Sequence, residues 1–290
     1  MLRLMLFLVA ASGAAGSAAG QAAPGADAPQ VQAVRRTSSI TLDGRLDEPD
    51  WARAIPASGF RQQDPDEGRP AAESTQVRFV YDDGALYVGA RMFDSRGAAG
   101  VQTRLARRDE QPGGDYLMLV LDTYHDHAGR TVLRINPSGV QYDALALGRA
   151  NPDPGWNAVW EAATRIDSLG WTAEIRIPFS QLRLPGSGAQ TWGLQIWRYE
   201  DRRNETSQWA FWSKREPGGP AYFGHLTGLV PNPGVVSVEA SPYVAVGVAP
   251  RAPDSGGGAA VYGTHATHTI GADLLLRAPG TSATVTLNPD

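Results

Sequence analysis

Residues 77–92 predict a β-hairpin; they read Val-Arg-Phe-Val-Tyr-Asp-Asp-Gly-Ala-Leu-Tyr-Val-Gly-Ala-Arg-Met. Apolar residues recur mostly with a period of two in both halves, which is the spacing of residues on one face of a β-strand. Asp82, Asp83 and Gly84 separate the halves, and a short Asp-Gly segment between alternating runs is a strong signal for a hairpin turn. The hairpin indicates that the residues around it also belong to a β-sheet fold.

The same alternation continues on both sides of the hairpin, with turn-forming clusters between the runs. Strands are predicted at residues 116–121, 131–135, 140–145, 159–166, 171–177, 192–199 and 208–212. Helical patterning is limited to residues 49–54 and 179–182, each long enough for one or two turns. Many short strands without long helices between them predict an all-β fold, an antiparallel two-sheet β-sandwich over residues 34–230.

The composition agrees with a turn-rich β-protein and excludes several functional classes. Among 290 residues there are 33 glycines and 21 prolines, and cysteine is absent. The absence of cysteine removes disulfides, thiolate catalysis and cysteine-ligated zinc sites. The net charge is −4, and the arginines form scattered pairs rather than the basic stripe that follows a phosphate backbone. Nucleic acid is therefore not expected as a partner.

The amino terminus has the pattern of a secretory signal peptide. Residues 1–22 combine a short basic start, an apolar run and a series of small residues, and the apolar run is too short to span a bilayer. Residues 23–33 are rich in alanine and proline and predict a flexible leader. The protein is therefore expected to be exported, to the periplasm or to the outer membrane and cell surface.

The pattern changes after residue 230. Residues 235–248 and 267–276 are longer alternating runs, separated by a glycine-rich stretch. Long alternating strands are typical of membrane β-barrels. Residues 231–290 are therefore predicted to be the first strands of a truncated β-barrel-like region.

Eight tryptophans raise the question of sugar binding, because flat aromatic faces stack on pyranose rings. Six of them lie in or beside alternating apolar runs and are expected in the core: Trp51, Trp160, Trp171, Trp192, Trp197 and Trp209. Trp156 lies in a turn-rich segment, and it and Trp212 are better placed to face solvent.

Four aspartates are candidates for a structural calcium site. Asp94, Asp115, Asp122 and Asp143 lie at strand ends or in loops, where oxygen-rich calcium sites are usually built. Capping of turns is the other role that such aspartates have.

A glycosidase would need two carboxylates across a cleft. Glu161 and Glu174 fall on strands expected to pair around the turn at residues 169–170, so the hairpin alone would bring them close. Cross-strand pairing with Arg165 and Arg176 explains the presence of the two glutamates on these strands equally well. We therefore assign no catalytic residue.

His125 and His127 lie on either side of Asp126, and alternate residues can point the same way and hold a metal ion. No third histidine or cysteine follows at a recognisable metal-site spacing, so a solvated hairpin tip is the favoured interpretation.

Several segments, in order along residues 34–229, resemble family 9 carbohydrate-binding modules, which are often appended to xylanases. The segments are Ile-Thr-Leu-Asp-Gly-Arg-Leu-Asp-Glu-Pro-Asp-Trp at 40–51, the hairpin at 81–94 and Phe-Gly-His-Leu at 223–226. Residues 134–143, 160–164 and 170–182 are similar to a group of exported bacterial proteins in which such a module precedes an uncharacterised outer-membrane β-barrel region, and residues 286–290 resemble a stretch early in that region. The resemblance implies a noncatalytic β-sandwich with a glycan, its own carboxy-terminal barrel region and, through that region, the outer membrane as partners.

The resemblance also locates the sugar site. Sugar-binding members clamp the reducing end of a glycan between two tryptophans, which correspond here to about Pro112 and a position near Pro217. A glutamate that contacts the sugar corresponds to about Met118, whereas an arginine is retained at Arg134. Trp156, Trp212 and Tyr222 are therefore the candidates for a differently placed aromatic platform beside Arg134.

Three functions follow as alternatives. The first is glycan capture or uptake, linked to carbohydrate catabolism, by a carbohydrate-binding module. The second is a structural domain that caps or assembles an outer-membrane barrel and binds no sugar. The third is part of a glycoside hydrolase that acts on a xylan-like polysaccharide.

Overall fold

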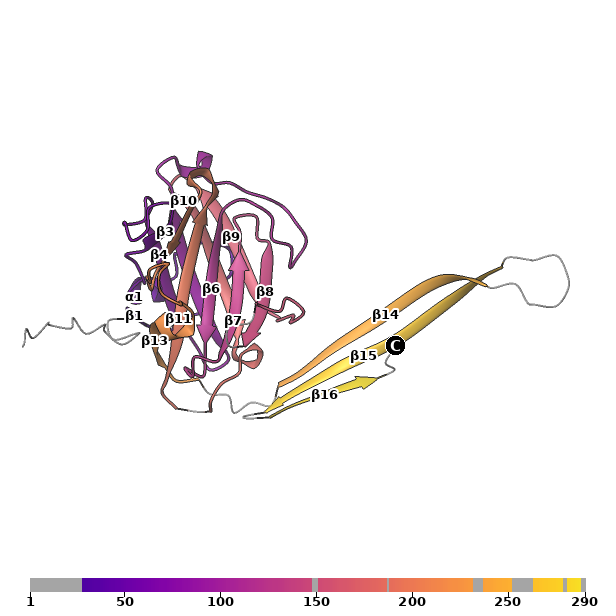
Figure 1. The fold of residues 1–290 in the computed structure, drawn as a ribbon. Coiled ribbons are helices and arrows are strands. Elements are labelled where there is room, and N and C mark those ends of the chain that lie inside the picture. The colour runs from indigo at the N-terminus through magenta and orange to yellow at the C-terminus, as the bar shows by residue number, and fades with distance from the viewer. Residues whose placement is uncertain are drawn as a thin grey trace, which may run out of the picture.

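The computed structural model describes residues 28–147, 151–186, 188–231, 237–251, 263–278 and 281–287. The predicted signal peptide, residues 1–22, and the first residues of the predicted leader lie outside the described residues. Up to residue 231 the described chain forms a two-sheet sandwich, and Figure 1 shows the two sheets face to face. The all-β sandwich expected from the sequence is confirmed.

The predicted hairpin lies in the middle of the five-stranded sheet. Its strands are β4 (Thr75–Tyr81) and β5 (Ala85–Phe93), and they pair antiparallel. Asp82 closes the turn because its Oδ1 accepts hydrogen bonds from the backbone N–H groups of Gly84 and Ala85, both at 2.8 Å. The strand order is β2-β4-β5-β10-β9, where β2 is Val34–Arg35, β10 is Gly170–Pro178 and β9 is Glu161–Asp167.

The second sheet has eight strands. Its main path is β1 (Gln30–Gln32), β13 (Gly224–Leu229), β11 (Gln190–Glu200), β6 (Tyr116–Asp122), β7 (Gly129–Ile135) and β8 (Gln141–Leu147). β12 (Glu205–Gln208) pairs with β11, and β3 (Arg61–Asp64) pairs with β12. Short 3-10 helices occupy four connections: Gly97–Ala99, Phe179–Gln181, Asp201–Arg203 and Pro220–Tyr222.

The main core fills the space between the two sheets. It includes Phe79 and Leu119, with Trp171 and Trp192 both fully buried. A second apolar layer covers the other face of the hairpin, where Trp51 from α1 (Pro49–Arg53) packs with Val80 and Tyr87. Gly89 makes this packing possible, because a Cβ atom there would lie 2.8 Å from the Trp51 ring. The hairpin is consequently buried on both faces.

Four details differ from the sequence-based expectations. β1 lies within the predicted flexible leader, and Val31 is buried because β1 extends the sheet alongside β13. Two strand pairs, β1 with β13 and β2 with β4, are parallel. The strand predicted at residues 208–212 is instead β12, Glu205–Gln208. Trp197 is half-buried on the outside of the sheet, whereas the other five tryptophans expected in the core are buried.

Residues 237–287 contribute a third, antiparallel sheet of β14 (Ser237–Arg251), β15 (Gly263–Ala278) and β16 (Thr281–Leu287). The described parts of the two long alternating runs, residues 237–248 and 267–276, are therefore strands, as expected. These three strands do not close into a barrel within the described residues, so the barrel-like region stays a prediction. No helix in the described part of the chain has the length and hydropathy needed to cross a membrane.

Candidate functional site

The candidate site is the outer face of the eight-stranded sheet. Along β6, Leu117, Leu119 and Leu121 point into the main core. Because side chains alternate along a strand, Tyr116 and Met118 lie on the outer face. Their cross-strand partners lie beside them: Tyr199 opposite Tyr116, and Trp197 and Arg134 on either side of Met118.

Three of these side chains form a stack, which we call the tyrosine–arginine stack: Tyr116, Arg134 and Tyr199. The Arg134 guanidinium carbon lies 3.7 Å from the centroid of the Tyr116 ring, and the ring centroids of Tyr116 and Tyr199 are 5.3 Å apart at an interplanar angle of 26°. Arg134 also donates to the Gln111 side chain (2.9 Å) and to the Pro112 carbonyl (3.2 Å). Burial lowers the pKa of Arg134 and raises that of Tyr116. The guanidinium is thus held in place on an aromatic surface.

A second aromatic group lies on the same face, around Trp212. Its ring centroid is 5.4 Å from that of Trp197 in an edge-on contact, and 6.3 Å from that of Phe223 at 25°. Tyr222 lies 6.1 Å from Trp212, and its hydroxyl donates to Glu216 (3.0 Å). Trp197 and Met118 pack against one apolar cluster with Trp212. The stack and the Trp212 group therefore lie on the same outer face, with Met118 between Arg134 and Trp197.

The structure brings together three of the four sequence-predicted sugar-binding residues. Arg134, Trp212 and Tyr222 all belong to this face. Trp156 does not, because it is half-buried and packs against the core between the two sheets. Tyr116 and Tyr199 were not identified from the sequence. Their alternation with buried leucines and isoleucines indicated strands, but it did not show which pairs meet across β6 and β11.

Comparison with solved structures finds similar sandwiches. A carbohydrate-binding module from Caldicellulosiruptor kristjanssonii, solved in complex with cellotriose, is 19% identical with a TM-score of 0.50, over 69% of this chain and 93% of that one. A candidate carbohydrate-binding protein from Bacteroides uniformis is 12% identical with a TM-score of 0.54, over 69% of this chain and 99% of that one. The sandwich has the fold of family 9 carbohydrate-binding modules. No protein-family model matches the sequence, and no curated protein matches it.

The positions to which the family 9 resemblance pointed lie on the same outer face. Pro112 accepts a hydrogen bond from Arg134, and Met118 pairs with Arg134 across β6 and β7. Pro217 adjoins Gly218, where a Cβ atom would lie only 2.6 Å from the Trp212 Nε1. Prolines stand at or near the two positions that, by the resemblance, would carry stacking tryptophans, and the aromatic side chains on this face come from the sheet and from Trp212.

Three buried carboxylates, Glu73, Asp94 and Glu200, form the acidic cluster, with ligand oxygens within 4.8 Å of one another. Arg202 lies among them: its Nη2 is 3.3 Å from Glu73, 3.2 Å from Asp94 and 2.8 Å from Glu200. Arg203 also contacts Glu73 (3.0 Å) and Glu200 (2.9 Å). A guanidinium therefore supplies the positive charge at this position, and these residues do not fit a resident calcium ion.

Of the other three predicted calcium ligands, Asp115 lies near this cluster and interacts electrostatically with Asp94, whereas Asp122 and Asp143 make separate contacts. Asp115 accepts backbone hydrogen bonds from Gln102 (3.2 Å) and Asp201 (2.9 Å). Asp143 accepts from the Ala158 backbone (2.6 Å) and pairs with Arg108. Asp122 contacts His127. The four aspartates thus hold loops in place at different points, and calcium binding stays a prediction.

The two glutamates considered for glycosidase chemistry have different surroundings. Glu161 is exposed and pairs with Arg176 at 3.2 Å. Glu174 is fully buried and accepts hydrogen bonds from the Asp43 and Gly44 backbones (3.0 and 2.8 Å) and from the Trp51 indole (3.1 Å). Burial raises the pKa of Glu174 to about 7. Glu174 anchors the segment that covers the hairpin, and this segment separates it from solvent.

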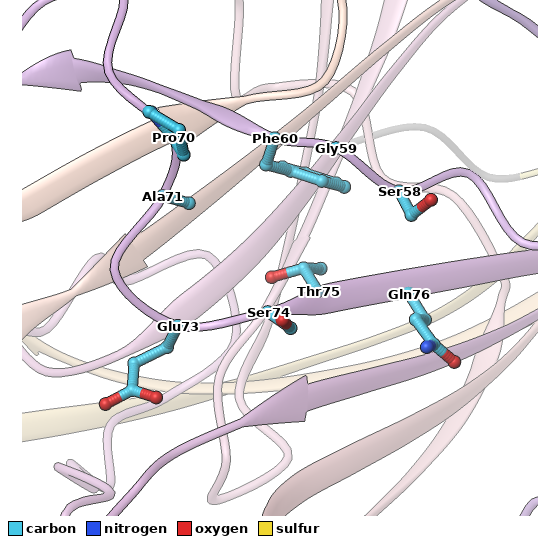
Figure 2. A pocket seen from close by; sticks show the side chains of 9 residues that line it. All are labelled: Ser58, Gly59, Phe60, Pro70, Ala71, Glu73, Ser74, Thr75 and Gln76. Atoms are coloured by element: carbon cyan, nitrogen blue, oxygen red, sulfur yellow. The ribbon is translucent and has the colours of Figure 1, made fainter.

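A hollow of about 210 Å³ lies at the start of β4. Figure 2 shows the residues that line it: Ser58, Gly59, Phe60, Pro70, Ala71, Glu73, Ser74, Thr75 and Gln76. Glu73 is its one carboxylate, and Figure 2 shows that this carboxylate extends away from Phe60. The hollow therefore lacks the pair of facing carboxylates that glycoside hydrolysis needs.

The histidine pair is not an isolated hairpin tip, because the fold adds a third histidine. His225 on β13 lies with its ring centroid 5.0 Å from that of His125, and His125 lies 5.4 Å from His127. Burial, together with these neighbouring imidazoles, lowers the pKa of His225. The sequence did not reveal this group, because His225 comes from a distant strand.

Proposed function

We propose that the sandwich is a noncatalytic carbohydrate-binding module that binds a glycan on the outer face of the eight-stranded sheet. The observation that carries the proposal is the tyrosine–arginine stack on the same outer face as the aromatic group around Trp212. Sugars present apolar C–H faces and hydroxyl groups together, so rings that pack against the former and a fixed guanidinium that donates to the latter suit them.

The fold supports the same proposal. The similar Caldicellulosiruptor kristjanssonii module was solved with cellotriose, a short β-glucan, so glucose and cello-oligosaccharides are the first ligands to test. Xylan is the second, because modules of this family are often joined to xylanases. The role that follows is glycan capture or uptake by an exported protein, as a step in carbohydrate catabolism.

The test is a titration of the protein with glucose and with cello-, xylo- and chito-oligosaccharides, followed by calorimetry or NMR. We expect saturable binding to at least one series, and Arg134→Ala is expected to weaken it about tenfold or more, since a hydrogen bond to a charged group contributes about 1.5–3 kcal/mol. Arg45→Ala is the matched control: Arg45 is half-exposed and contacts only Asp43 among the described ion pairs. Absence of binding in every series, or equal affinity of the Arg134 variant, would contradict the proposal.

A second candidate, a domain that caps or assembles an outer-membrane barrel, is favoured by the third sheet. Val244 and Val246 are 68% and 75% exposed, and Ile270, opposite Val244 on β15, is 66% exposed. Because alternate residues share a face, these apolar side chains form one exposed row. Membrane fractionation of cells that make the protein tests this candidate, which requires the protein to sediment with outer membranes and to be extracted only by detergent.

A further inference from the structure

Three of the five histidines of the chain meet at one end of the outer face, next to a buried aspartate. Asp122 ends β6 and has no exposed surface, and His225 is on β13. Gly193 on β11 lies between them, paired with Asp122 on one side and His225 on the other. His125 and His127 follow Asp122 directly in the loop to β7. We call these four side chains the histidine cluster: Asp122, His125, His127 and His225.

Two atoms of the histidine cluster are buried without a hydrogen-bond partner. They are Asp122 Oδ1 and His225 Nδ1. The other Asp122 oxygen, Oδ2, accepts from the His127 backbone N–H at 2.9 Å, so Oδ1 alone remains available. A buried carboxylate oxygen or ring nitrogen left unpaired costs roughly 1–3 kcal/mol, and such atoms in native proteins usually have a ligand, ion or water as partner. Both unpaired atoms are metal-ligand atoms.

The separations of His125 from the other two imidazoles suit shared coordination. Imidazoles bound to one tetrahedral ion through nitrogens at about 2.0–2.1 Å place their ring centroids roughly 5 Å apart. The observed separations are 5.0 Å for His125 and His225 and 5.4 Å for His125 and His127. No three ligand atoms of the histidine cluster lie within 4.8 Å of one another in the structure, so the imidazoles must rotate about their side-chain bonds to turn their nitrogens toward a common point. His127 is 49% exposed, which gives an ion a path in from solvent.

We propose that Asp122, His125, His127 and His225 bind a divalent transition-metal ion, with Zn²⁺ as the ion to test. Three imidazoles, which are nitrogen ligands of borderline softness, suit zinc, and zinc also accepts a carboxylate; calcium and magnesium prefer sites made of oxygen ligands alone. The acidic cluster differs from the histidine cluster in two ways. All of its potential ligand atoms are oxygens, and the Arg202 guanidinium already lies among them. The ion would link the loop after β6 to β13 and so hold this loop against the outer face of the sheet.

The test uses the full chain, freed of metal by a chelator and titrated with Zn²⁺ against a chromophoric competitor at neutral pH. We expect one high-affinity ion per chain and a higher midpoint of thermal unfolding in zinc, because an ion that binds only the folded state stabilises it. His225→Asn is expected to raise the Kd at least about 100-fold, since changes even to groups behind metal ligands cost 10–100-fold. Circular dichroism of each variant checks that the sandwich is intact.

Two further variants make the result decisive. Asp122→Asn keeps the size of the side chain and is expected to weaken zinc binding and to remove the zinc-dependent rise in unfolding temperature. His268→Ala, an exposed histidine on β15 outside the cluster, is expected to leave both unchanged. Failure of the protein to bind Zn²⁺, or retention of full affinity by His225→Asn, would overturn the proposal, because the ion would then be absent or held only by the surface pair His125 and His127.

Discussion

Replacement of Arg202 by methionine is expected to lower the free energy of unfolding by about 3–5 kcal/mol at neutral pH, because it breaks a buried ion-pair network from one side. The Arg202 guanidinium contacts all three carboxylates of the acidic cluster, at 2.8–3.3 Å. Without it, Glu73, Asp94 and Glu200 would stay buried with too little positive charge. Denaturant unfolding of the variant and of the original protein measures the difference.

The control and the pH dependence make this prediction specific. Arg69→Met removes an arginine that is 73% exposed and 3.7 Å from Asp66, and exposed pairs contribute at most about 1 kcal/mol. In the Arg202 variant the loss is expected to shrink as the pH falls toward about 4, because Glu73 and Glu200 can then take up protons instead of remaining charged. If Arg202→Met lowers the free energy of unfolding no more than Arg69→Met does, the prediction is wrong, and Arg203 and Arg198 supply enough positive charge for the acidic cluster.

The second large effect concerns Glu174 and the pH dependence of stability. Burial raises the pKa of Glu174 from 4.5 to about 7. Between these values the folded protein holds a proton that the unfolded chain releases, so stability is highest at the lower pH and falls as the pH rises. The loss attributable to this one group is about 3 kcal/mol across the interval, at about 1.4 kcal/mol per pH unit.

Glu174→Gln removes the titration while it keeps the size and one acceptor oxygen for the Asp43 and Gly44 N–H groups. The stability of this variant, measured by denaturant unfolding at several pH values, is expected to vary less between pH 4.5 and pH 7 than that of the original protein. Measurements at lower pH would include Asp50, whose pKa is held below its usual value because hydrogen bonds from Ser38 and Thr37 outweigh its burial. Glu161→Gln, an exposed neighbour, should follow the original protein. Identical pH profiles for Glu174→Gln and the original would refute the role assigned to Glu174.

The strands were predictable from the sequence, but their surroundings were not. Alternation around Asp82-Asp83-Gly84 correctly predicted β4 and β5. Val80 and Tyr87, on the face that alternation assigns to the solvent side, are nevertheless buried, because Trp51 and the segment around it cover that face. Similarly, Trp197 was expected in the core. Side chains on β11 alternate between the two faces of the sheet, and this alternation places Trp197 on the outer face.

The candidate site was predictable in part. Arg134, Trp212 and Tyr222 carried signals of residue type and family resemblance, and they lie on one face. Tyr116 and Tyr199 meet only because β6 and β11 are neighbours in an order that the sequence does not state. The third histidine has the same origin: His225 reaches His125 because β13 and β6 both pair with β11.

The amino-acid sequence alone determined the class of fold, the positions of most strands and the absence of cysteine chemistry, since these depend on local alternation, turn residues and composition. Only the tertiary structure decided which polar groups share a buried environment. Arg202 and Glu73, for example, are 129 positions apart in the chain. The physical reason is that sheet order and register bring distant residues together. Once such residues are buried, an unpaired charge or polar atom costs folding free energy, so each one needs a partner among the residues that the fold places beside it.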